Sequence, residues 1–205
     1  VLLFCFSCNL SSNDNSKTVN QKDGDKNENK EIICGAERIE EYLPKIKGKR
    51  VGVVANHTSV VAGKHLIDSL VSLNVDVKMI FSPEHGFRGD QDAGKLLKDS
   101  KDPKTGIKVK SLYGKTKKPS DADLDNLDIV LFDIQDVGVR FYTYISTMHY
   151  VMEACAENDV HLLILDRPNP NGSLIDGPVL NPDFSSFIGM HKVPVAHGMT
   201  IAEYA

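Results

Sequence analysis

The sequence has 205 residues, 41% of them hydrophobic, which is enough for one sizeable buried core. Acidic residues outnumber basic residues by 28 to 24, and because no basic run occurs, nucleic acid is excluded as the main partner. The four cysteines show no metal-ligand spacing, since the C-x-x-C of Cys5 and Cys8 lies in an apolar stretch without a strand or helix pattern.

Residues 1–30 are predicted to lie outside the folded domain. The first ten read V-L-L-F-C-F-S-C-N-L, which is too short to span a bilayer but typical of the end of a signal-peptide apolar region. Ser7 before Cys8 resembles a bacterial lipoprotein cleavage site, with an ordinary buried segment as the alternative. Residues 11–30 are almost entirely polar and predict a disordered tether. We therefore expect an exported chain on the periplasmic side or in the cell envelope of a bacterium, attached to the membrane only through a lipid anchor.

Residues 31–205 alternate between predicted strands and helices. Apolar residues at helical spacing predict helices over residues 37–47, 64–73 and 141–158, and Ser and Asp capping residues predict a short helix over residues 120–127. Short apolar runs predict strands over residues 50–55, 75–81, 106–113, 128–134 and 160–165. Pro44 is expected to break or kink the first helix, and residues 90–105 are interpreted as a surface excursion. Continuous apolar strands alternating with amphipathic helices predict an α/β fold, in which helices cover both faces of a parallel sheet. Residues 198–205 resemble the start of a further helix, so we interpret the chain as a fragment that lacks a C-terminal domain.

Polar and charged side chains are concentrated where the predicted strands end. They are Asn56 after the first strand, Glu84, His85 and Arg88 after the second, Asp133, Gln135, Asp136 and Arg140 after the fourth, and Arg167 and Asn169 after the fifth. Because the carboxyl ends of parallel strands lie at one edge of a sheet, these side chains predict a ligand site at that edge.

The residue types in this set favour acid–base chemistry over other kinds of site. Neither G-x-G-x-x-G nor a phosphate-binding loop follows the first strand, and no G-x-S-x-G occurs, which disfavours nucleotide binding and serine nucleophiles. Histidines at 57, 85 and 197 lack metal-ligand spacing, so we expect no metal and no other cofactor, although a metal-dependent hydrolase stays open as an alternative. Paired carboxylates remain, and glycoside hydrolysis needs two of them across a cleft.

Glu84 is the predicted proton donor, and it would have to be partly desolvated to hold its proton near neutral pH. Asp136 is the predicted partner carboxylate. Asp133 and Asp166 are interpreted as structural groups that cap helices and pair with nearby arginines, because strand-terminal side chains point partly into the fold.

Five motifs, taken in order, make the chain resemble the NamZ-type exo-β-N-acetylmuramidases, a family formerly described only as a domain of unknown function. The motifs are A-N-H-T (55–58), S-P-E-H-G-F-R-G (82–89), D-I-Q-D-V-G-V-R-F-Y-T-Y (133–144), D-R-P-N-P-N-G (166–172) and H-G-M-T-I-A-E-Y-A (197–205). The resemblance implies a Rossmann-like N-terminal domain, a second C-terminal domain and an active cleft between them. It also implies removal of terminal N-acetylmuramic acid from the non-reducing ends of peptidoglycan fragments, with Glu84 as the catalytic acid.

The implied substrate carries a lactyl carboxylate, which a guanidinium can bind through two parallel hydrogen bonds. Arg88 is the first choice for this contact, because Arg140 and Arg167 have Asp136 and Asp166 nearby as structural partners. The remaining predicted substrate-binding residues are Asn56, Gln135 and Asn169 for hydroxyl and N-acetyl groups, Tyr142 for stacking on a sugar face, and His85 and His197. A non-catalytic lipoprotein that binds a muropeptide in the same cleft is the alternative function.

Overall fold

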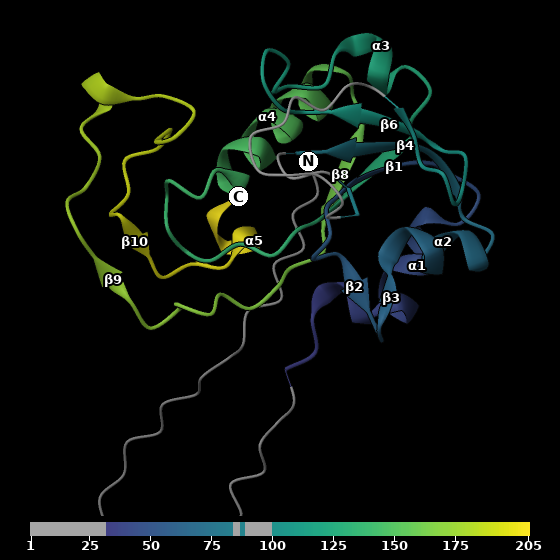
Figure 1. Ribbon diagram of the computed structural model, residues 1–205, viewed down its shortest axis with the longest axis horizontal. Coiled ribbons are helices and arrows are strands. Elements are labelled where there is room, and N and C mark those ends of the chain that lie inside the picture. The colour runs from purple at the N-terminus through teal and green to yellow at the C-terminus, as the bar shows by residue number, and fades with distance from the viewer. Residues whose placement is uncertain (1–31, 84–86, 89–99) are drawn as a thin grey trace, which may run out of the picture.

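The computed structural model describes residues 32–83, 87–88 and 100–205. The predicted N-terminal tether, most of the predicted excursion at 90–105, and the side chains of Glu84 and His85 lie outside these residues. At the centre is a six-stranded sheet in the order β5-β6-β4-β1-β7-β8 (Figure 1). Its strands are β1 (Arg50–Ala55), β4 (Asp76–Ser82), β5 (Ser100–Lys101), β6 (Lys108–Ser111), β7 (Ile129–Asp133) and β8 (His161–Ile164).

The predicted parallel sheet is confirmed, with one short exception at its edge. Each of β1, β4, β6, β7 and β8 runs parallel to its neighbour, whereas β5 pairs antiparallel with β6. Numbered along the chain, the five parallel strands have the spatial order 3-2-1-4-5, which is the Rossmann order 3-2-1-4-5-6 without its sixth strand. The strand order reverses between β1 and β7. The carboxyl ends of these two strands are therefore where this fold places a ligand crevice.

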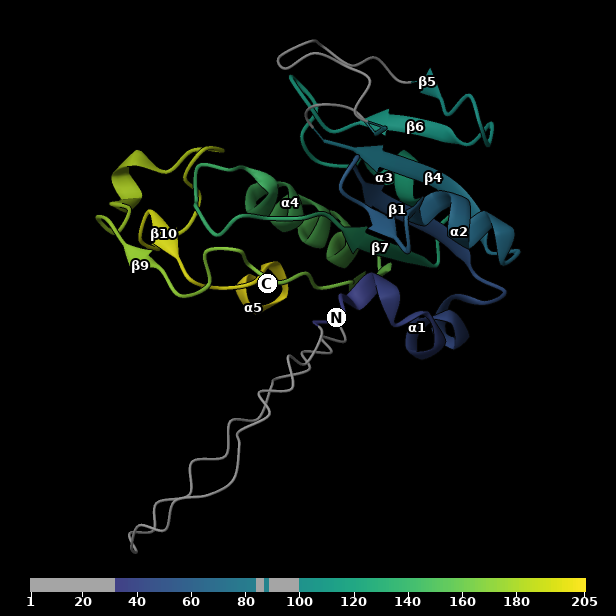
Figure 2. The ribbon, with the colours of Figure 1, turned by 60° about the horizontal axis from the view of Figure 1, so that its bottom comes forward.

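Helices cover both faces of the sheet, as predicted (Figure 2). The helices are α1 (Ile39–Ile46), α2 (Leu66–Ser72), α3 (Asp121–Leu124), α4 (Tyr144–Glu157) and α5 (Ile201–Tyr204), with a 3-10 turn η1 at Gly35–Glu37. On one face, Ile46 of α1 and Leu70 of α2 pack with Val53 of β1. On the other face, Ile145 and Met148 of α4 pack with Phe132 of β7. Removal of these apolar side chains from water is the main force that fixes each helix on its face of the sheet.

Two local predictions differ from the structure. A break of the first helix at Pro44, one of the two outcomes expected there, does not occur, because α1 continues to Ile46. The predicted helix at 64–73 begins only at Leu66, since Lys64 and His65 form strand β3, which pairs antiparallel with β2 (Val60–Val61). The hairpin turns through Ala62 and Gly63, whose φ angles are +48° and +75°. Glycine adopts such positive φ angles readily, and alanine does so rarely, so the turn lacks the usual sequence signal.

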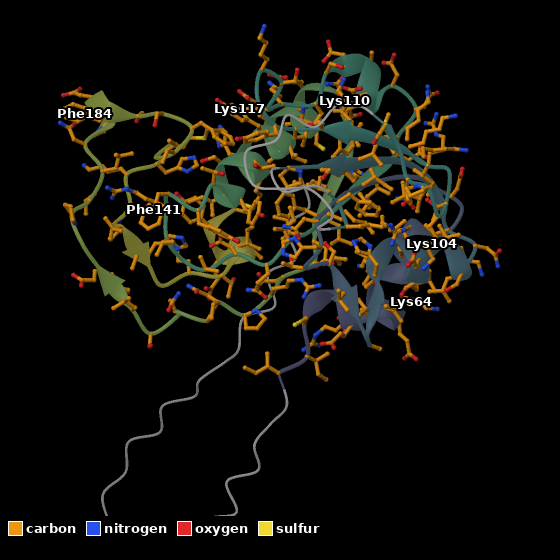
Figure 3. The ribbon with its side chains drawn as sticks, in the orientation of Figure 1. Lys64, Lys104, Lys110, Lys117, Phe141 and Phe184 are labelled. Atoms are coloured by element: carbon orange, nitrogen blue, oxygen red, sulfur yellow. The ribbon has the colours of Figure 1, made fainter. Side chains whose placement is uncertain are left out.

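Residues 170–197, which we call the arm, extend away from the sheet and return to it (yellow in Figure 1). The arm contains strands β9 (Ile175–Asp176) and β10 (Ala196–His197), which pair antiparallel, and a 3-10 turn η2 (Pro182–Phe184). Figure 3 shows Phe184 at the outer end of the arm, where 75% of its surface is exposed. The helices that the structure describes include none with the length and apolar character needed to cross a membrane.

Candidate functional site

Asp136 lies just beyond the end of β7, at the point where the strand order reverses. It is buried, and its Oδ2 accepts a 2.8 Å hydrogen bond from the N–H of Gly138. Gly138 has a φ of +73°, and a Cβ there would lie within 2.2–2.6 Å of the Asn169 side chain, so this turn requires glycine. The second carboxyl oxygen, Oδ1, is buried and has no hydrogen-bond partner among the described residues. Burial raises the pKa of Asp136 to about 6, although the N–H groups of Gly138 and Val137 oppose the shift.

His197 faces Asp136 from strand β10. The Nε2 atom of the imidazole lies 4.0 Å from Oδ2 of Asp136, and it is likewise buried without a hydrogen-bond partner in the described part of the chain. Its Nδ1 accepts a hydrogen bond of 3.3 Å from the N–H of Met199, which places the ring proton on Nε2. Burial lowers the pKa of His197, which favours the neutral form of the ring.

Together, Asp136 and His197 place a carboxyl oxygen and a ring nitrogen without hydrogen-bond partners close to each other. Buried polar atoms almost always have a partner, and an orphaned pair therefore marks a place where a ligand or water supplies one. A hydroxyl group can donate to the carboxylate and accept from the imidazole N–H at once. A carboxyl with a pKa of about 6 can also gain or lose a proton near neutral pH, which suits acid–base chemistry.

A tyrosine and two further histidines extend this pair toward the surface. The ring of Tyr204, on α5, lies 5.0 Å from that of His197, and its hydroxyl is 3.0 Å from Nδ1 of His191. Nε2 of His191 is in turn 3.2 Å from Nδ1 of His149, on α4. Burial, with a smaller effect of the Asp136 charge, raises the pKa of Tyr204 to about 12. The sequence interpretation did not include Tyr204, although Thr200 and Glu203 form a capping box that predicts a helix at that position.

The three amides expected to contact substrate all make internal hydrogen bonds. Asn56 is fully buried, where its Oδ1 accepts from Thr58 N–H and its Nδ2 donates to the Tyr144 hydroxyl at 3.0 Å. Gln135 Nε2 donates to the carbonyls of Asp136 and Pro168, at 2.7 and 2.8 Å. Asn169 Nδ2 donates to Met199 O at 2.9 Å. In this structure these amides connect the loops that follow β1, β7 and β8, and their contact with substrate stays a prediction.

Two of the three arginines expected near the site have carboxylate partners. Arg88 is held between Asp68 and Asp102, with its Nη2 2.8 Å from Asp102 Oδ2 and 3.0 Å from Asp68 Oδ1. Arg167 pairs with Asp133, through Nε–Oδ1 and Nη2–Oδ2 distances of 2.6 and 3.1 Å. Burial raises the pKa of Asp133, and the guanidinium opposes that shift.

The expected pairing of Arg167 with Asp166 is therefore wrong. Asp166 instead accepts hydrogen bonds from the Thr200 hydroxyl and the Ala202 N–H, at 2.8 and 3.1 Å, and so caps α5. The expected pairing of Arg140 with Asp136 is also wrong, because Nη1 of Arg140 donates to the carbonyls of Pro178 and Val193. The structural roles expected for Asp133 and Asp166 agree with these contacts.

The remaining candidates are Tyr142, Glu84 and His85. Tyr142 is half-buried, with its ring 4.9 Å from that of Tyr144 in an edge-to-face contact. Glu84 and His85 lie outside the described residues, so their roles stay predictions. Within residues 32–83, 87–88 and 100–205, no group of three or more histidine, cysteine or acidic side chains could hold a metal ion.

Comparison with known proteins gives close matches over most of the chain. The profile of a family described as "Exo-beta-N-acetylmuramidase NamZ, N-terminal" matches residues 51–205. The peptidoglycan β-N-acetylmuramidase NamZ of Bacillus subtilis (strain 168) is 50% identical over 171 residues, which are 82% of this chain and 41% of that protein. Two crystal structures of DUF1343 family proteins from Bacteroides fragilis NCTC 9343 have TM-scores of 0.74 and 0.75, with 48% and 41% identity. The matches cover 82% of this chain but only 44% and 43% of those chains, so it spans less than half the length of these relatives.

Proposed function

The chain belongs to the family of NamZ exo-β-N-acetylmuramidase N-terminal domains, and we propose that the full-length protein is an exo-acting glycoside hydrolase. Its proposed reaction is the release of terminal N-acetylmuramic acid from the non-reducing ends of peptidoglycan fragments. The observation that carries this proposal is the buried Asp136–His197 pair, with two unpartnered polar atoms at the ligand edge of a Rossmann-like sheet. The name of the Bacillus subtilis relative supports the choice of substrate.

In the proposed reaction, two carboxyl groups act on either side of the glycosidic bond. Glu84 donates a proton to the leaving oxygen as the bond to the anomeric carbon breaks. Asp136 takes a proton from the water that attacks that carbon, so the sugar gains a hydroxyl group and the leaving sugar gains a hydrogen. His197 contributes its Nε2–H as a donor to a substrate hydroxyl beside Asp136. The unpartnered Oδ1 and the pKa of about 6 support Asp136 in this role.

A release assay on the full-length protein tests the proposal. We expect it to liberate a chromogenic leaving group from a β-linked N-acetylmuramic acid substrate, and to keep its rate after thorough chelation of metal ions. Loss of activity on chelation would instead favour a metal-dependent hydrolase. Calorimetric binding of a muropeptide without any turnover would reject hydrolysis and favour the alternative of a non-catalytic muropeptide-binding lipoprotein.

We also propose that the protein acts outside the cytoplasmic membrane, through a lipid attached to Cys8. The support is the sequence alone: an apolar segment, a small residue before a cysteine, and a polar tether. We expect bacterial cells that express the full-length protein to incorporate labelled palmitate into it, and Cys8→Ala to abolish this incorporation. Cys155→Ala, which changes a buried core cysteine, is the control that should keep the label. Equal labelling of the Cys8→Ala variant would reject the anchor.

A further inference from the structure

Arg140 has a guanidinium group with unused donors. Its Nη1 donates to the carbonyl oxygens of Pro178 and Val193, at 2.6 and 2.8 Å. Unlike Arg88 and Arg167, it has no carboxylate partner among the residues that the structure describes. A guanidinium offers five N–H donors and keeps its positive charge at every physiological pH. Arg140 therefore carries an uncompensated charge in a half-buried position.

The two carbonyls also fix the orientation of the Arg140 side chain. Both bind Nη1, which leaves Nε and Nη2 without a hydrogen-bond partner among the described residues, as the free edge of the guanidinium plane. This edge has two parallel N–H groups at the spacing of the two oxygens of a carboxylate. Because the arm already holds the group in place, a carboxylate that binds there loses little affinity to side-chain ordering. Gly189 stands beside this edge, where a Cβ would lie 4.0 Å from Nε.

Arg140 also belongs to the same part of the molecule as the Asp136–His197 pair. The N–H of Arg140 donates to Val195 O at 2.9 Å, and the N–H of His197 donates to Gly138 O at 3.0 Å. Residues 138–140 and 195–197 therefore run side by side as a short antiparallel pair. The charges of Asp136 and Arg140 both act on the hydroxyl of Tyr204, which packs against His197. Figure 3 shows the neighbouring Phe141 where this loop faces the arm.

We propose that Arg140, rather than Arg88, recognises the carboxylate of the substrate's lactyl group, through bidentate hydrogen bonds from Nε and Nη2. This inference rests on the proposed function, since the lactyl group distinguishes N-acetylmuramic acid from N-acetylglucosamine. It assigns Arg88 to a structural role, because that guanidinium is already occupied by two carboxylates. Arg140 then acts as a specificity-determining residue, while the Asp136–His197 pair acts at the reacting bond.

The test compares free N-acetylmuramic acid with its methyl ester, in which one added methyl group removes the charge of the lactyl carboxylate. Their inhibition constants are measured in the release assay with the full-length protein. The wild type should bind the acid about 10- to 100-fold more tightly than the ester. Arg140→Gln should abolish this preference while leaving ester binding within about twofold of the wild type. Arg140→Lys keeps the charge but loses the two parallel N–H donors of the guanidinium, so it should retain only part of the preference.

A second variant, with its own control, keeps the inference testable if Arg140→Gln fails to fold. Gly189→Ala places a methyl group beside the free edge of Arg140 and should weaken binding of the acid more than binding of the ester. Arg38→Gln, which removes an exposed arginine paired with Glu41, is the control and should change neither constant.

Equal weakening of both ligands by the Arg140 and Gly189 variants would overturn the inference, because it is the result of a purely structural anchor. The proposed function would then stand, since the wild type would still release N-acetylmuramic acid. A wild type without release activity would reject the proposed function itself.

Discussion

Replacing Asp136 by asparagine is expected to lower the rate of N-acetylmuramic acid release by about 10²- to 10⁴-fold, which is the usual contribution of a positioned acid or base. The asparagine side chain has nearly the same shape, and its oxygen can still accept the hydrogen bond from Gly138 N–H. The change therefore removes proton transfer and the buried charge while keeping the shape of the side chain. Glu84→Gln should cause a loss of similar size if Glu84 is the proton donor.

The same Asp136 substitution is expected to make the protein more stable at pH 7. Burial raises the folded-state pKa of Asp136 to about 6, whereas an unfolded aspartate has a pKa of about 3.9. The folded protein therefore binds this proton more tightly, and the charged carboxylate lowers stability once the pH rises through this interval. Removing the charge should raise the free energy of unfolding by about 1 to 3 kcal/mol at pH 7, and by almost nothing below pH 4.

The two readouts separate a catalytic from a structural role. Release rates come from the chromogenic substrate, and stabilities from urea unfolding at pH 7 and pH 4. Asp125→Asn, at an exposed position after α3, is the control that should leave both unchanged. Full activity in Asp136→Asn would remove Asp136 from the mechanism. A variant that loses activity and stability together would indicate that the carboxylate holds the loop in place.

The parallel sheet was predictable because each of its strands is a short, continuous apolar run. The strand over residues 50–55 has the predicted bounds, since a glycine and charged residues precede it and polar residues follow it. The hairpin of β2 and β3 and the pairing of β9 with β10 were missed. Their strands have two residues each, too few for a period-two pattern to be recognised.

The sequence located the edge that carries the candidate site but misassigned the partners within it. Asp166 and Arg167 are neighbours in an extended segment, where consecutive side chains point in opposite directions. Arg167 therefore meets Asp133, 34 residues away, and Asp166 meets α5. Likewise, Asp136 lies beside His197 of strand β10, which is distant along the chain, so no local sequence pattern reports this neighbour.

Breaking the buried ion pair between Asp133 and Arg167 is expected to have the largest effect on stability. Asp133 is fully buried and Arg167 nearly so, and the pair lies at the end of β7, beneath the candidate site. Removing one partner leaves the other charge buried without compensation, which typically costs about 3 to 5 kcal/mol. We expect a loss of this size in the free energy of unfolding for Arg167→Met, and a similar loss for Asp133→Asn.

The surface pair of Asp76 and Lys78 provides the matched control. Both side chains are about half exposed, so Asp76→Asn should change the free energy of unfolding by less than about 1 kcal/mol. Urea unfolding of the full-length protein, followed by circular dichroism, measures all of these variants. A loss of less than about 1 kcal/mol in Arg167→Met would show that Asp133 does not stay buried as an uncompensated charge, because it takes up a proton or is reached by water.

The double variant Asp133→Leu with Arg167→Met decides what the pair contributes. The cost of removing two charges from water offsets most of the attraction between them. The same cost raises the pKa of Asp133 in spite of the adjacent guanidinium. Replacing both charges with apolar groups should therefore cost less than either single change, with a coupling energy of about 3 kcal/mol or more. Arg167 also donates to the carbonyl of Val60 at 3.3 Å, which connects the β2–β3 hairpin to the end of β7. If the double variant is stable but slow in the release assay, the ion pair serves to position the segment after β7, which carries Asp136, rather than to hold the fold together.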